Sequence, residues 1–106
     1  MTRRETNGPV EHAGHRHARL EALLRDELAS LLDGELDDPA LAGTRIVHVT
    51  LSVDYRHAKV FFDCTGGSPR AQVERGLERA SGFLRARLAD AIDLKRVPEL
   101  RFVAYV

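Results

Sequence analysis

The sequence has a single cysteine, no tryptophan and no long apolar run. Cys64 has no partner for an internal disulfide, which fits a reducing compartment. No stretch approaches the ~20 apolar residues that a membrane span needs, and residues 1–14 lack the apolar core of a signal peptide. We therefore expect a cytoplasmic protein with no membrane partner.

Motifs for catalysis and cofactor binding are also missing. His12, His15 and His17 cluster near the N-terminus, where solvated side chains are expected rather than a metal site. His57 has no candidate nucleophile beside it, which favours a surface or packing role. Gly66-Gly67 is not followed by the lysine and serine or threonine of a phosphate loop. We expect no enzyme activity, no cofactor, no metal and no small-molecule substrate.

Aromatic residues are few, which limits how the chain can recognise a nucleic acid. Only Tyr55, Phe61, Phe83 and Tyr105 are candidates for stacking on bases. We therefore expect any nucleic acid to be recognised by its shape and backbone rather than by its base sequence.

The formal net charge is zero, but the charges are segregated along the chain. Residues 33–43 carry four acidic side chains and no basic one, whereas residues 66–96 carry seven basic side chains against four acidic ones. The acidic stretch lacks the ligand spacing of a calcium loop and is expected to be solvated. The segregation predicts a polarised molecule that can orient on a polyanion.

The length of 106 residues predicts one small domain, which we place at 15–106 after a disordered leader over 1–14. The hydrophobic periodicity predicts the order α-β-β-α-α-β. The predicted elements are a helix from 14–16 to 32–33, strands over 44–53 and 57–64, two helices within 68–93, and a last strand with Leu100, Phe102 and Ala104. The first two strands form a hairpin, and a right-handed crossover makes the last strand parallel to a neighbour, with helices covering one face.

Two local patterns give more detail. In the first helix, Glu21 precedes Arg25 by four residues, a spacing that favours an ion pair. In the strands, alternation groups two sets of side chains on common faces. These sets are Val47, Val49, Leu51 and Val53 in the first strand, and Ala58, Val60, Phe62 and Cys64, facing inward, in the second.

The stretch from Ser68 to Asp93 has one apolar stripe with a glycine inside it. Ser68 and Pro69 suit the start of a helix. The stripe recurs at steps of three and four, as expected for one helical face. Its members are Val73, Leu77, Ala80, Leu84, Leu88 and Ile92. Gly82 costs about 1 kcal/mol relative to alanine in an uninterrupted helix, so a kink or a close backbone approach is predicted there.

Basic side chains surround the predicted kink. A solvated surface with pairs inside the helix is one reading of them. The other is a phosphate site, because a helix break presents the positive end of a second helix beside arginines. The predicted phosphate-binding residues are Arg75, Arg79, Ser81, Gly82, Arg85, Lys95 and Arg96, with Arg16, Arg19 and Lys59 as the alternative surface.

Four motifs in this order resemble the bacterial ribosome-binding factor A family, over about 16–102. They are Asp38-Pro39, the segment Val53 to Val60 with Arg56-His57-Ala58-Lys59-Val60 at its core, Ala80-x-Gly82-Phe83-Leu84-Arg85, and Pro98-Glu99-Leu100-Arg101-Phe102. Relatives commonly continue into a C-terminal tail, whereas this sequence stops at Val106. Contacts made by such a tail are not expected here.

The resemblance implies an α+β, type II KH-like domain in which Ala80-Ser81-Gly82 forms the helix-kink-helix. It also implies a ribosome biogenesis factor that binds 16S rRNA on the free 30S subunit without catalysis. Such a factor assists late 30S maturation and rRNA processing at the 16S 5′ end, mostly in the cold. We expect a monomer. The alternative function is a protein-interaction module that uses the first helix or a sheet edge and binds no RNA.

Overall fold

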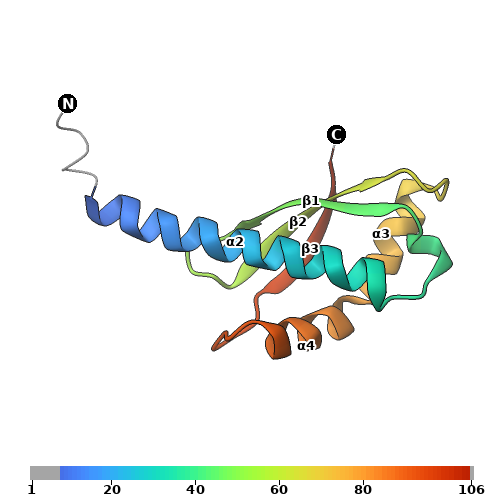
Figure 1. Cartoon of the computed structure of the whole chain (residues 1–106). Helices are drawn as coiled ribbons and strands as arrows, with labels where there is room; N and C mark the ends of the chain where they lie inside the picture. Colours follow the sequence, from blue (N-terminus) through green and yellow to red (C-terminus); the bar gives the residue numbers. More distant parts are fainter. Residues whose placement is uncertain (1–7, 106) are drawn as a thin grey trace.

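The computed structural model describes residues 8–105, and their side chains from residue 15 onward. It confirms the predicted order of elements and adds one short 3-10 helix (Figure 1). The elements are α2 (Gly8–Gly34), η1 (Pro39–Leu41), β1 (Thr44–Leu51), β2 (His57–Cys64), α3 (Arg70–Arg79), α4 (Ser81–Ala91) and β3 (Glu99–Ala104). In η1, the Asp38 carboxylate accepts a hydrogen bond from the amide of Ala40 at 3.0 Å, which starts the turn at Asp-Pro.

Helix α2 begins earlier than the sequence predicted. It starts at Gly8 rather than between Gly14 and Arg16, with Pro9 in the first turn, where a proline costs no intrahelical hydrogen bond. Residues 8–14 are thus helical and not part of a disordered leader, while residues 1–7 of that predicted leader lie outside the described residues. The polar composition of 8–14 suggested disorder. These residues nevertheless extend a helix whose later residues, such as Leu24 and Leu28, pack in the core.

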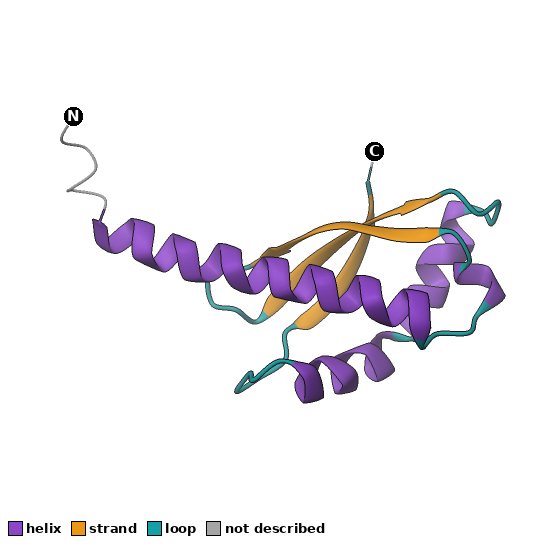
Figure 2. Ribbon diagram, viewed as in Figure 1, coloured by secondary structure: helices purple, strands orange, loops and turns teal. Residues whose placement is uncertain are grey.

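The sheet has three strands in the order β1-β2-β3 (Figure 2). Strands β1 and β2 pair antiparallel, and β3 pairs parallel to β2, with His57 opposite Glu99. Both pairings were predicted. The parallel pairing places the start of β3 beside the start of β2, so the loop before β3 lies next to the turn between β1 and β2.

A bulge in β1 changes which residues face the core. The pairing register shifts between Ile46 and His48, so Val47 is the extra residue of the bulge. As a result Ile46 is buried together with Val49 and Leu51, whereas strict alternation had placed Val47 with them. Val53 lies beyond the strand and is 93% exposed, so the prediction that it shares a face with Val49 and Leu51 is wrong.

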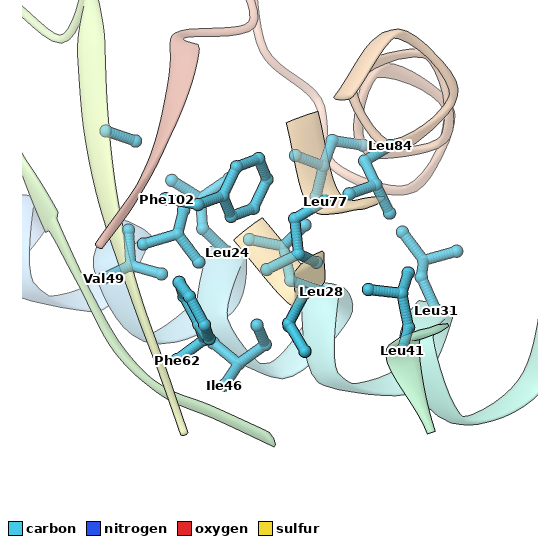
Figure 3. Packing of buried hydrophobic residues seen from close by; sticks show 14 of the residues in the cluster. Leu24, Leu28, Leu31, Leu41, Ile46, Val49, Phe62, Leu77, Leu84 and Phe102 are labelled. Carbon is cyan, nitrogen blue, oxygen red and sulfur yellow. The ribbon is translucent and has the colours of Figure 1, made fainter. Parts of the chain in front are cut away.

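The described α-helices α2, α3 and α4 pack on one face of the sheet around one core (Figure 3). The central strand β2 contributes Ala58, Val60 and Phe62, each fully buried. Most of the predicted stripe reaches this core. Val73, Leu77, Leu84 and Leu88 are buried, and Ala80 and Ile92 pack partly buried against them.

Two side chains of α2 fasten the helix to the end of β1. Glu21 accepts a hydrogen bond from the amide of Leu51 at 2.7 Å, and His17 Nε2 donates to the carbonyl oxygen of the same residue at 2.9 Å. The predicted pair between Glu21 and Arg25 does not form, since Arg25 lies 2.7 Å from Asp26. The helical spacing alone predicted an ion pair for Glu21, whereas its carboxylate bonds to the backbone of the edge strand β1.

We expect Glu21→Ala to lower the free energy of unfolding by about 1–2 kcal/mol, because it leaves the Leu51 amide without its charged acceptor. The measurement is the urea midpoint at pH 7. Glu21→Gln keeps an acceptor oxygen and should lose clearly less. Equal midpoints for wild type and Glu21→Ala would contradict the role of this bond.

Candidate RNA-binding surface

The predicted kink is present. Helices α3 and α4 are separate and run in different directions, with Ala80 between them at φ −84° and ψ −3° (Figure 1). No side chain caps the first turn of α4, which begins at Ser81. The positive end of α4 thus lies at the surface beside the bend.

Gly82 has a different explanation from the one the helix pattern suggested. A Cβ built on Gly82 would meet nothing within 4 Å, and the residue is exposed in the first turn of α4. The bend itself falls at Ala80. Among the described residues, no close approach therefore requires a glycine at position 82.

The arginines of α3 lie next to the acidic stretch. Arg79 is 3.7 Å from Asp38, with 64% of its side chain exposed, and Arg75 is exposed one turn earlier. In α4, Arg87 is 3.0 Å from Glu35. The expectation of acidic and basic segments at opposite poles is therefore wrong, because the end of α2 and the following loop pack against α3 and α4.

Arg85 does not lie with the arginines of α3. Its Nε and Nη2 donate to the carbonyl oxygens of Pro98 and Val97 at 3.1 and 3.0 Å. The side chain is half-buried. Its guanidinium thus holds the loop between α4 and β3, which carries Lys95.

Lys95 and Arg96 lie on that loop, in a second basic group at the other end of the sheet. They line a cleft of about 460 Å³ with Arg16 from α2 and Arg56 from the turn between β1 and β2. We call this the basic cleft. The structure thus divides the predicted residues between the kink, with Arg75, Arg79, Ser81 and Gly82, and the basic cleft, with Lys95 and Arg96.

Arg56 is the cleft residue that the sequence analysis did not assign to a site, although Arg56 belongs to one of the recognised motifs. The predicted parallel pairing of the last strand could have identified Arg56 as a site residue. Parallel strands begin at the same edge of a sheet, so the loop before the last strand had to lie beside the turn that holds Arg56.

Other chemistry finds little support in the described part of the chain. No three histidine, cysteine or acidic side chains there gather closely enough to hold a metal ion, and His12 has no described side chain. Burial raises the pKa of the Cys64 thiol, which keeps it protonated as expected for a small packing residue. Of the described helices, none is long and apolar enough to cross a membrane.

A three-stranded mixed sheet covered on one face, with a helix-kink-helix between β2 and β3, defines an α+β domain of the type II KH-like class. Residues 16–104 match the model of the family described as ribosome-binding factor A. The chain belongs to this family.

Relatives and solved structures agree with this assignment. Ribosome-binding factor A of Nitrosomonas eutropha is 43% identical over 89 residues, which are 83% of this chain and 76% of that protein. The crystal structure of ribosome-binding factor A from Thermus thermophilus superposes with a TM-score of 0.78 at 32% identity, over 83% of this chain and 93% of the other. A homology model of the Thermus thermophilus protein, fitted into a cryo-EM map of its complex with the 30S subunit, gives a TM-score of 0.68 at 31% identity, over 81% and 91%.

Proposed function

We propose that this protein binds the free 30S ribosomal subunit through its 16S rRNA and, without catalysis, assists late maturation, including processing of the rRNA 5′ end. The family membership and the 30S complex of the Thermus thermophilus relative support the ribosomal partner. The observation that carries the RNA contact is the bend at Ala80, where the uncapped start of α4 lies beside the exposed Arg75 and Arg79.

The proposed mechanism is selective binding. Arg75 and Arg79 neutralise phosphates, and the backbone at Ser81 and Gly82 lets a phosphodiester approach closely. Lys95 and Arg96 make a second cationic contact at the basic cleft. A factor that binds one RNA conformation more tightly than another shifts their populations by that difference in affinity. We propose that it acts as a cytoplasmic monomer and matters most in the cold, when RNA rearrangements are slow.

Co-sedimentation tests this proposal. The full chain is spun with free 30S subunits, with assembled 70S ribosomes and with naked 16S rRNA, over a series of salt concentrations. We expect binding to free 30S subunits, with a log-log slope of a few units against salt, as for neutralisation of about four phosphates. Failure to bind 30S subunits, or an affinity that does not change with salt, would refute the proposal.

Gly82→Ala separates the RNA contact from the fold. Because the added methyl group enters open space in a helix, we expect the free energy of unfolding to rise by about 0.5 kcal/mol. We also expect the affinity for 30S subunits to fall about tenfold, because the methyl group would occupy space used by the RNA backbone. Urea unfolding and the co-sedimentation assay measure the two effects. A more stable variant with unchanged affinity would place the contact elsewhere.

A further inference from the structure

The basic cleft is formed by three segments that are distant in sequence. The N-terminal half of α2, the turn between β1 and β2, and the loop before β3 meet at one end of the sheet (Figure 1). The cleft has a volume of about 460 Å³, which is within the ~300–1,000 Å³ typical of pockets for small ligands.

The rim of the cleft carries a surplus of positive charge. Arg16, Arg56, Lys95 and Arg96 line it, all are exposed, and none forms an ion pair with another described residue. Asp54 is the only acidic side chain among the lining residues. The cleft therefore suits an anionic ligand.

Asp54 is already engaged within its own turn. Its carboxylate accepts hydrogen bonds from the Ser52 hydroxyl at 2.7 Å and from the Arg56 amide at 3.1 Å. The first of these bonds is the main reason that the pKa of Asp54 is lowered. Asp54 thus shapes the turn and does not form an ion pair with any of the four cations.

Behind the charged rim, the cleft is apolar and has one aromatic side chain. Leu20, Leu51, Leu94 and Pro98 line it, and Leu51 is 5% exposed. Tyr55 is 37% exposed. Cationic side chains can bind a phosphate, and an aromatic ring with aliphatic side chains beside it can contact a base. The cleft therefore combines the two kinds of contact that a nucleotide makes.

Tyr55 packs against a histidine of α2 at the edge of the cleft. It is the one described non-glycine residue with positive φ, at 63°, and its ring centroid lies 4.8 Å from that of His17. His17 in turn donates its hydrogen bond to Leu51. The ring therefore lies against His17 at the cleft.

The loop that carries Lys95 and Arg96 is also held on its side next to β3. Arg85 holds it through the carbonyl oxygens of Val97 and Pro98, and the amide of Glu99 donates to the Arg56 carbonyl oxygen at 2.9 Å. A preformed cleft loses little conformational entropy when a ligand binds.

We propose that the basic cleft holds one unstacked nucleotide of the bound RNA, with its phosphate against Arg16, Arg56, Lys95 and Arg96 and its base against Tyr55 and the apolar lining. This inference rests on the proposed function, since it assumes that RNA is the partner. It gives the protein a requirement for an unpaired nucleotide, which contacts to phosphate alone would not impose.

The experiment uses the full chain and variants of Tyr55. Affinity is measured by fluorescence anisotropy with a labelled single-stranded RNA decamer and by co-sedimentation with 30S subunits. We expect Tyr55→Leu to weaken both about tenfold through lost base stacking, with an unchanged salt slope, because no charge is altered. Tyr55→Phe should bind as wild type. Tyr105→Leu is the matched control, since Tyr105 is 50% exposed beyond the opposite end of β3.

Amide chemical shifts locate the site and identify the ligand. The RNA decamer and single nucleoside 5′-monophosphates should both shift the amides of Tyr55, Arg56, Lys95 and Arg96, and the decamer should do so at much lower concentration. If the monophosphates saturate the site as tightly as the decamer does, the ligand is a free nucleotide and the proposal fails. Equal shifts by a polyglutamate peptide would also refute it, because the cleft would then be a general anion surface.

Two results distinguish the failure of this inference from that of the proposed function. If wild-type protein does not co-sediment with 30S subunits, both are refuted. If wild type binds 30S subunits and the decamer, and Tyr55→Leu binds both equally well, the nucleotide site is refuted and the proposed function is retained.

Discussion

Reversing Lys95 and Arg96 together to glutamate is expected to lower the affinity for free 30S subunits about 100-fold. Each of the two charged contacts to phosphate contributes about 1.5 kcal/mol, and every 1.4 kcal/mol is a factor of ten. The slope of the salt dependence should also fall by about two units. The fold should be unaffected, because both side chains are exposed and neither pairs with a described carboxylate. Co-sedimentation over a salt series measures both quantities.

A control for this variant must change the net charge by the same amount at another place. Arg70→Glu with Arg101→Glu does so, because both arginines are exposed, neither pairs with a described carboxylate and neither lines the basic cleft. We expect this control to weaken binding several-fold less than the reversal at Lys95 and Arg96. Equal losses would mean that the RNA responds only to overall charge, and no loss in either variant would make the cleft an ordinary solvated surface.

Gly66→Ala is expected to lower the free energy of unfolding by about 3 kcal/mol. The loop after η1 and the loop after β2 cross at Gly43 and Gly66, where the Thr65 amide donates to the Gly43 carbonyl oxygen at 3.0 Å. A Cβ on Gly66 would overlap the carbonyl oxygen of Ala42, which is backbone and cannot rotate away. Forcing the two loops apart strains the end of the β1–β2 pairing where Thr44 lies opposite Cys64. Urea unfolding measures the loss.

Gly34→Ala is the matched control, because a Cβ on Gly34 meets nothing within 4 Å and its φ is not positive. It should change the free energy of unfolding by about 0.5 kcal/mol or less. If Gly66→Ala were as stable as this control, the loops would be free to move apart, and their crossing would not contribute to the fold.

The fold was predictable where the pattern was local and regular. The stripe from Val73 to Leu88 gave both helices of the pair, and the alternation of Ala58, Val60 and Phe62 gave the buried central strand. Prediction failed where one residue broke the regularity. At Val47 a single extra residue exchanges the two faces of β1, and nothing in the side chains of a strand reports such an insertion.

The candidate site was only partly predictable. The bend at Ala80 followed from small residues within an apolar stripe, which is local information. The partner of Arg85 was not predictable, because it consists of two backbone carbonyl groups at Val97 and Pro98, whose positions depend on how the loop folds. The pairing of Arg79 with Asp38 required η1 to pack against α3, which is a tertiary contact.

The end of β1 is poorly suited to accept a strand from another polypeptide. The bulge at Val47 twists the strand, and the N–H and C=O groups of Leu51 are already bonded to Glu21 and His17. An incoming strand would have to displace both side chains before it could extend the sheet there. This arrangement should suppress edge-to-edge aggregation on that side and leave β3 as the more accessible border.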